Sequence, residues 1–117
     1  MDGKTGSTED IKEVIIMAKL YFTITGTNFR YGDSFLEKDM KVRLIKEPDN
    51  EFDKEAIRVE LEGLGKIGYV ANSTRTVIGE CHSAGYILDK IKDDAEGKIM
   101  YVTDNGIVGV VSKKSLV

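Results

Sequence analysis

The polar segment 47–59 carries the residues best suited to binding chemistry, and it contains the only proline of the chain, Pro48. Pro48 fixes its own φ angle, and the side chains of Asn50 and Asp53 can bond nearby backbone amides, so the loop should hold one shape. Phe52 lies between two acidic residues and should therefore point away from the core. A rigid loop of this kind can present a stacking ring beside hydrogen-bonding groups, which is the chemistry that binds an unpaired nucleobase.

Catalytic chemistry has little support in the sequence, which contains one histidine and one cysteine. Cys81 and His82 are neighbours in a segment that we expect to be helical, so their side chains should diverge by about 100° rather than form a nucleophile and base pair. We expect Cys81 in the core and His82 at the surface. The chain also lacks the glycine-rich motifs that bind nucleotide phosphates. The sequence therefore predicts a protein that is not an enzyme and that has no cofactor.

Alternating carboxylates in the same polar segment raise the hypothesis of a divalent cation site. The spacing does not fit a calcium-binding loop, because Lys54 stands where the sharp turn requires glycine. We therefore expect a solvated turn and no metal site. The carboxylates concerned are Glu47, Asp49, Glu51, Asp53 and Glu55.

Four motifs, taken in their order along the chain, resemble those of the HIRAN domain. The resemblance covers residues 21–92, and its most specific part is the segment 47–59. It implies a small OB-like β-barrel, which in DNA-remodelling ATPases grips the free 3′ end of single-stranded DNA. The motifs are Thr23-Ile24-Thr25-Gly26, Phe29-Arg30-Tyr31-Gly32, the segment 47–59, and Lys66-Ile67-Gly68-Tyr69-Val70.

The resemblance implies an aromatic clamp for the last base of the strand. Tyr31 and Phe52 would hold this base between them, and Tyr69 would lie beside them. The family often has tyrosine at the position of Phe52, so this chain lacks a hydroxyl there but keeps the stacking face. Each stacked base can contribute about 1–3 kcal/mol to binding.

The resemblance also implies polar contacts to the terminal nucleotide. Arg30 and Asn50 would hold its polar edge or its phosphate, and Asp53 would accept a hydrogen bond from the 3′-hydroxyl. A carboxylate in this position would repel a 3′-phosphate and so would select a free end. Ala71 and Asn72 stand where DNA-binding relatives can offer lysine, and we therefore expect binding to be weak or local.

The residues by themselves leave a second interpretation open. Tyr31 and Phe52 could cap one end of a barrel, Asn50 and Asp53 could serve only to form a turn, and Arg30 could pair with a surface acid. Exposed rings beside an acidic turn could also dock a protein partner. The alternative hypothesis is accordingly a protein-interaction adaptor that does not bind nucleic acid.

Charge and composition limit the functional classes to which the protein can belong. The chain has 17 basic and 20 acidic residues and a net charge of −3, so it has no long-range positive field to gather phosphates. Binding of nucleic acid must be local, and nothing in the composition separates DNA from RNA. No apolar run approaches the roughly 18 residues that span a bilayer. We expect a cytoplasmic protein without membrane contact.

The pattern of apolar residues predicts a mainly β fold with one or two helices, a small OB-like β-barrel of about six strands. Alternation in residues 19–25 places Leu20, Phe22 and Ile24 on one face, and a helix should begin at Ser73 or Thr74 and run to about residue 83. Residues 1–10 should form a disordered tail and 11–117 one domain, in which 11–18 is a short helix or strand. The segments with strand character are 19–25, 41–46, 56–61, 66–70, 86–91, 98–102 and 107–111.

Overall fold

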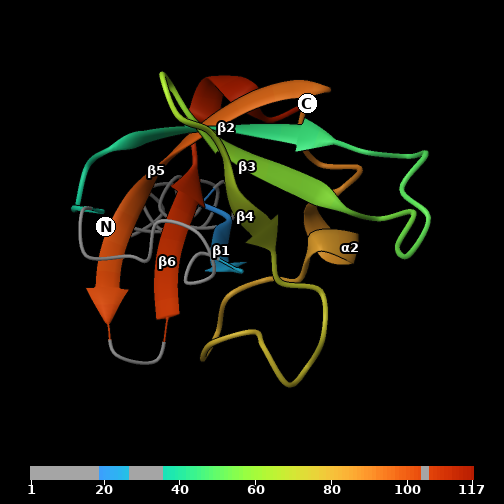
Figure 1. Ribbon diagram of the computed structural model, residues 1–117, viewed down its shortest axis with the longest axis horizontal. Coiled ribbons are helices and arrows are strands. Elements are labelled where there is room, and N and C mark those ends of the chain that lie inside the picture. Colours follow the sequence, from blue (N-terminus) through green and yellow to red (C-terminus); the bar gives the residue numbers. More distant parts are fainter. Residues whose placement is uncertain (1–18, 27–35, 104–105) are drawn as a thin grey trace, which may run out of the picture.

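A computed structural model describes residues 19–26, 36–103 and 106–117, which are mainly β-strands (Figure 1). The expectations for residues 1–18 and for Arg30 and Tyr31 lie outside the described residues. The elements are β1 (Tyr21–Thr25), β2 (Lys41–Lys46), β3 (Ile57–Leu61), β4 (Gly65–Val70), α2 (Ala84–Ile87), β5 (Asp94–Thr103), β6 (Gly106–Val111) and the 3₁₀ helix η1 (Lys113–Ser115).

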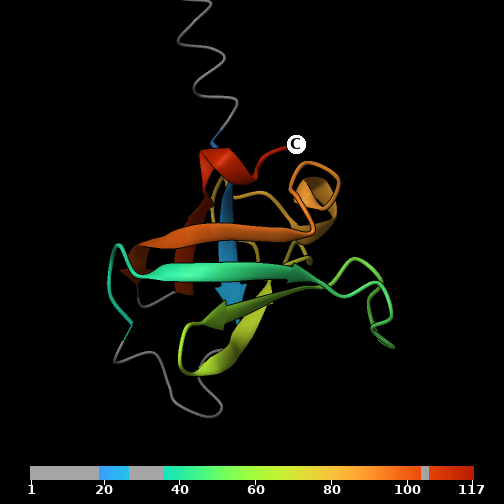
Figure 2. The same ribbon diagram turned by 90° about the horizontal axis from the view of Figure 1, so that it is seen from above.

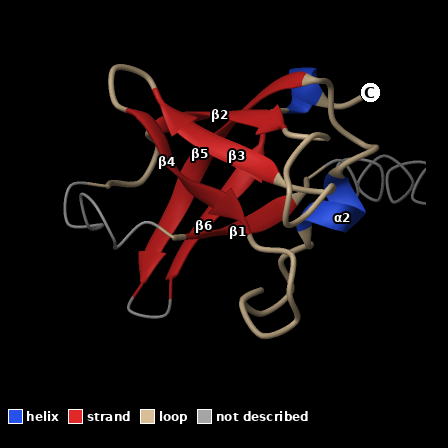
Figure 3. Cartoon of the chain, turned by 45° about the vertical axis from the view of Figure 1, so that its right-hand side comes forward, coloured by secondary structure: helices blue, strands red, loops and turns tan. Residues whose placement is uncertain are grey.

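The six described strands close into a barrel in the order β1-β4-β3-β2-β5-β6, and every neighbouring pair is antiparallel. Figure 3 shows the strands around one interior, with α2 to one side. Closure pairs β1 with both β4 and β6, so neither edge of the sheet stays open. The expectation of a mainly β, OB-like barrel is confirmed.

The interior of the barrel follows the alternation in the sequence. Phe22, Leu44 and Val59 are inaccessible to solvent, and each comes from a different strand. The predicted inward faces of β1, β2 and β3 are confirmed. Thr23 is buried as well. Its Oγ1 accepts a 2.9 Å hydrogen bond from the backbone N–H of Ile78, which gives this buried hydroxyl a partner.

A β-bulge interrupts the pairing of β3 with β4. Val59 pairs with Gly68 and Glu60 pairs with Lys66, so Ile67 is an extra residue in β4. Ile67 and Gly68 are consecutive and both buried. A Cβ atom on Gly68 would lie 2.1 Å from the carbonyl oxygen of Thr25, so only glycine allows this approach of β4 to β1.

The helix predicted to start at residue 73 or 74 is wrong. Residues 73–83 form turns and irregular backbone, and α2 begins only after Ser83, whose hydroxyl accepts a 3.2 Å hydrogen bond from the Tyr86 amide. The His82 amide donates instead to the carbonyl of Tyr21, at 2.7 Å, which ties this segment to β1. The left-handed backbone of Gly79, with φ of 53°, also ends any helical path.

The strand predicted over residues 86–91 is wrong as well. Tyr86 and Ile87 belong to α2, which spans Ala84–Ile87. Of this segment, Ile91 alone among the described residues bridges to another strand-like residue, Leu116. No helix among the described residues is long and apolar enough to cross a membrane.

The last hairpin is longer than the sequence predicts. β5 extends over ten residues and pairs first with β2 and then with β6. Residues 104–105, between the two strands, lie outside the described residues, and Gly106, the first residue of β6, has a φ of 145°. After β6, the hydroxyl of buried Ser115 accepts a 2.8 Å hydrogen bond from the Glu96 amide and holds η1 against β5.

Candidate nucleic-acid interface

The loop between β2 and β3, residues 47–56, projects from the barrel in Figures 1 and 2. Asn50 shapes it, since its Oδ1 accepts hydrogen bonds from the amides of Phe52, at 2.8 Å, and Asp53, at 2.9 Å. Asp53 continues the pattern by accepting from the Glu55 amide at 2.9 Å. These bonds to backbone groups hold the tip of the loop in one conformation.

Phe52 stands at the tip of this loop. Its exposed fraction is 94%, so the ring makes almost no contact with the core. The neighbouring backbone is fixed by Asn50 while the ring itself remains in solvent. A large apolar surface held in this way is available to a ligand.

Glu47 organises the base of the loop. Its Oε1 accepts from Tyr69 Oη at 3.0 Å and from Asn50 Nδ2 at 2.9 Å, and its Oε2 accepts from Arg58 Nη1 at 2.6 Å. Arg58 also donates to Glu60 at 2.8 Å. One carboxylate thus joins the loop to the outer faces of β3 and β4.

This network shifts the pKa values of its members. Burial raises the pKa of Glu47, but the hydrogen bonds from Asn50, Tyr69 and Arg58 outweigh burial and leave the pKa below its ordinary value. Burial and the hydrogen bond to the Glu47 carboxylate raise the pKa of the Tyr69 phenol. Glu47 is ionised and Tyr69 is protonated at neutral pH, as the hydrogen bond between them requires.

A hollow of about 430 Å³ lies between the loop and the outer face of β4. Its volume is within the range of small-ligand sites, and its walls combine ring surfaces with hydrogen-bonding groups. The Lys66 ammonium lies 5.1 Å from the centroid of the Tyr69 ring. The lining residues are Asn50, Phe52, Asp53, Ala56, Lys66, Tyr69 and Val70.

Asp53 has a second contact besides the Glu55 amide. Its Oδ2 accepts a 3.0 Å hydrogen bond from Asn72 Nδ2, and Asn72 Oδ1 in turn accepts from the Gly85 amide of α2 at 2.8 Å. The Asp53 side chain is only partly buried. A carboxylate oxygen can accept more than one hydrogen bond, so Asp53 retains acceptor capacity toward the solvent.

The structure brings four of the six predicted site residues to this one hollow: Asn50, Phe52, Asp53 and Tyr69. The other two, Arg30 and Tyr31, lie outside the described residues. Sequence reasoning missed the contribution of Lys66. The isolated glycine Gly68 indicates a bulge or a close backbone approach in this strand, but it does not indicate which residue of β3 faces Lys66.

A second hollow has in its wall Asn72, whose side chain is hydrogen-bonded to Asp53 of the first hollow. His82 stacks on Tyr86 there, with ring centroids 4.2 Å apart, and Lys90 Nζ lies 4.1 Å from the centroid of the Tyr86 ring. Cys81 is partly exposed in the same wall and does not belong to the core, contrary to expectation, because its segment is not a helix packed on the barrel.

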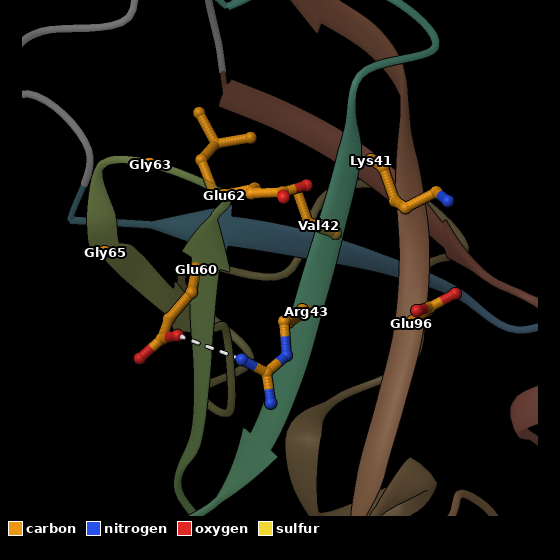
Figure 4. Close-up of a pocket in the computed structure, with 9 residues that line it drawn as sticks. Lys41, Val42, Arg43, Glu60, Glu62, Gly63, Gly65 and Glu96 are labelled. Carbon is orange, nitrogen blue, oxygen red and sulfur yellow. Dashed lines mark ion pairs between the residues drawn. The ribbon is translucent and has the colours of Figure 1, made fainter.

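A third hollow, on the outer faces of β2, β3 and β5, is less suited to a phosphate (Figure 4). Arg43 lies across it, with Nη1 4.0 Å from Glu60 and Nη2 2.9 Å from Asp94. Glu60, Glu62 and Glu96 line the hollow against the cations Lys41 and Arg43. The carboxylates outnumber the cations and would repel an anion.

No group of three or more histidine, cysteine or acidic side chains in the described ranges is arranged to hold a metal ion. Three of the loop carboxylates have side-chain partners. Glu47 binds Arg58, whereas Asp53 and Glu55 both accept from Asn72 Nδ2.

Comparison with known proteins gives one family and one solved structure. A family model described as the HIRAN domain matches residues 17–114. The crystal structure of the HIRAN domain of human HLTF is similar to the chain with a TM-score of 0.51 and 20% sequence identity, over 80% of this chain and 74% of that one. Comparison with curated protein sequences gave no significant match. The family model spans most of the sequence and the barrel has the fold of the solved domain, so this chain belongs to the HIRAN domain family.

Proposed function

We propose that the protein is a non-catalytic module that binds single-stranded DNA and recognises its 3′-hydroxyl end in the hollow beside the 47–56 loop. Membership of the HIRAN family supports a nucleic-acid-binding module in general terms. The observation that carries the finer proposal is the position of Phe52, which is 94% exposed at the rim of the hollow that Asp53 and Tyr69 also line.

In this proposal the terminal base stacks on Phe52. An exposed ring on a fixed loop loses little conformational freedom on binding, and stacking tolerates any base because every base has a π face. Tyr31 would complete the clamp from the other side. Arg30 and Asn50 would contact the polar edge or phosphate of the nucleotide. The side-chain amide of Asn50 has two N–H donors, and one remains after the other bonds to Glu47.

Asp53 supplies the selection for an end. Its partly exposed carboxylate can accept a hydrogen bond from a 3′-hydroxyl, whereas a 3′-phosphate would bring two negative charges together. An internal nucleotide has no free hydroxyl at this position. The same carboxylate thus favours a terminal nucleotide over a continuing strand.

A fluorescence anisotropy titration tests the proposal. Oligodeoxynucleotides of one sequence, labelled at the 5′ end, would carry a 3′-hydroxyl or a 3′-phosphate, and the 3′-hydroxyl form should bind more tightly. Asp53→Asn should reduce the difference between the two ends, because the amide has no negative charge to repel phosphate. Equal binding of both ends to the unmodified protein, or no binding at micromolar protein, would overturn the proposal.

A protein-interaction adaptor is the second candidate, and the surroundings of Phe52 favour it. The ring projects between Glu51 and Asp53, both carboxylates, in a chain of net charge −3. An exposed ring among acids fits an apolar and basic surface on a partner protein. Absence of oligonucleotide binding together with capture of a defined partner that Phe52→Ala abolishes would support this candidate.

A further inference from the structure

The bulge in β4 places Lys66 beside Tyr69 on the outside of the barrel. Along a regular strand, residues three apart point to opposite faces. Here Tyr69 pairs with Arg58 and Lys66 pairs with Glu60, and these two partners are alternate residues of β3 on its outer face. The extra residue Ile67 thus shifts the alternation and brings Lys66 to the face that bears Tyr69.

The sequence supports this bulge with specific residues. Ile67 points into the core with 4% of its surface exposed, and Gly68 follows it inward without a side chain. The carbonyl oxygen of Thr25 occupies the position that a Cβ atom of residue 68 would need. Bulges are often found next to functional sites, where they redirect a side chain.

Among the residues that the structure describes, Lys66 is the one cation that lines this hollow. It forms no ion pair with any residue in the described ranges, and its ammonium rests over the Tyr69 ring at 5.1 Å. Arg58, the nearest alternative on this face, is engaged by Glu47 at 2.6 Å and by Glu60 at 2.8 Å. Lys54 lines a different hollow, between the loop and Leu88.

We propose that Lys66 binds the phosphate that joins the terminal nucleotide to the one before it. The inference rests on the proposed function and adds to it the residue that contacts the backbone. An exposed contact between an ammonium and a ring is weak, so the Lys66 side chain can leave Tyr69 for a phosphate oxygen. Its charge would offset the absence of lysine at Ala71 and Asn72, the two positions after β4.

Lys66 and Asp53 would then orient the bound strand within the hollow. Both line it, and their charges are opposite. The carboxylate suits the hydroxyl that ends the strand, and the ammonium suits the phosphate on the 5′ side of the same nucleotide. A strand entering with a phosphorylated 5′ end would instead place that phosphate against the Asp53 carboxylate, which would repel it.

The salt dependence of binding tests this inference. One phosphate contact on a single strand contributes about 0.7 to the slope of the logarithm of the binding constant against the logarithm of salt concentration. Lys66→Ala should lower the slope by about that amount and weaken binding several-fold at low salt, while Lys66→Arg should retain both. Lys113→Ala is the matched control, because Lys113 is exposed on η1 and does not line the hollow.

The preference for a 3′-hydroxyl end distinguishes a failure of this inference from a failure of the proposed function. Lys66→Ala should keep the preference for a 3′-hydroxyl over a 3′-phosphate, which depends on Asp53. An unchanged slope in Lys66→Ala, or an equal fall in Lys113→Ala, would overturn the role of Lys66 even if Phe52→Ala weakens oligonucleotide binding and Asp53→Asn reduces the preference for a 3′-hydroxyl. If the unmodified protein did not bind the oligonucleotide, or if Phe52→Ala and Asp53→Asn left binding unchanged, both the role of Lys66 and the proposed function would be overturned. Circular dichroism of each variant would verify that it is folded.

Discussion

The hydroxyl of Tyr69 donates a 3.0 Å hydrogen bond to the Glu47 carboxylate, which links the outer face of β4 to the first residue of the loop after β2. The same Oε1 atom accepts from Asn50, whose other amide atom fixes the backbone of Phe52. The orientation of one aromatic wall of the hollow and the shape of the loop therefore depend on a single carboxylate.

Replacing the Glu47 carboxylate should loosen both the Tyr69 ring and the loop after β2. Glu47→Ala leaves the Tyr69 hydroxyl and the Asn50 amide without their acceptor and should lower the free energy of unfolding by about 1–3 kcal/mol, since hydrogen bonds to charged groups are the costlier ones to lose. Urea denaturation measures this loss. Glu62→Ala, at an exposed position in the β3–β4 turn, should change it by less than about 0.5 kcal/mol. Equal effects of the two substitutions would contradict the role of Glu47.

The stability should also depend on pH through this network. The pKa of Glu47 is lowered in the folded protein, so its contribution is present above the unfolded pKa of about 4.3 and is lost as pH falls through the folded value. The free energy of unfolding should therefore differ between the protein and Glu47→Gln at about pH 7, and the difference should narrow toward about pH 3. A difference that stays constant between these pH values would exclude the linkage.

Tyr69 should make the free energy of unfolding depend on pH in the alkaline range. Its pKa is raised on folding, so its contribution is complete below the unfolded pKa of about 10 and is lost as pH rises through the folded value. In a spectrophotometric titration, the phenolate absorbance that Tyr69→Phe lacks should appear above the ordinary value of about pH 10, and its appearance at or below that pH would contradict the raised pKa.

Gly68 supports the bulge that redirects Lys66. In Gly68→Ala the new methyl group would meet the Thr25 carbonyl oxygen at 2.1 Å, so β1 and β4 must move apart or lose the bulge. We expect a loss of about 1–3 kcal/mol or more in the free energy of unfolding, as in other overpacked sites. Leu64→Ala, at a partly exposed position of the preceding turn, serves as the control in thermal or urea denaturation. Unchanged stability of Gly68→Ala would show that the two strands have room to separate.

The parts of the fold that local patterns determine could be predicted from the sequence. β2 has the predicted bounds, because Val42 and Leu44 alternate with charged residues and Pro48 follows two positions after its last residue. The rigid loop could be predicted for a similar reason, since the bonds from Asn50 Oδ1 and Asp53 Oδ1 that shape its tip join residues two or three positions apart.

The parts that distant contacts determine could not be predicted. Residues 73–83 have helical spacing, but Ile78 and His82 donate to groups of β1, and these tertiary bonds replace helical ones. The position of Lys66 depends on which residue of β3 faces it, and the sequence of β4 by itself does not specify that register. The clustering of site residues beside Lys66 therefore required the structure.

Phe52 offers the most direct separation of binding from folding. The ring is 94% exposed, so Phe52→Ala removes almost no buried surface and should leave the free energy of unfolding within about 0.5 kcal/mol of its original value. If the terminal base stacks on this ring, the same substitution should weaken oligonucleotide binding by about 1–3 kcal/mol, and Phe52→Tyr, which keeps the stacking face, should not. Anisotropy titration and urea denaturation of the three proteins measure the two quantities independently. Unchanged affinity in Phe52→Ala would mean that the ring serves another ligand, whereas a fall in stability as large as the fall in affinity would mean that Phe52 acts through the fold.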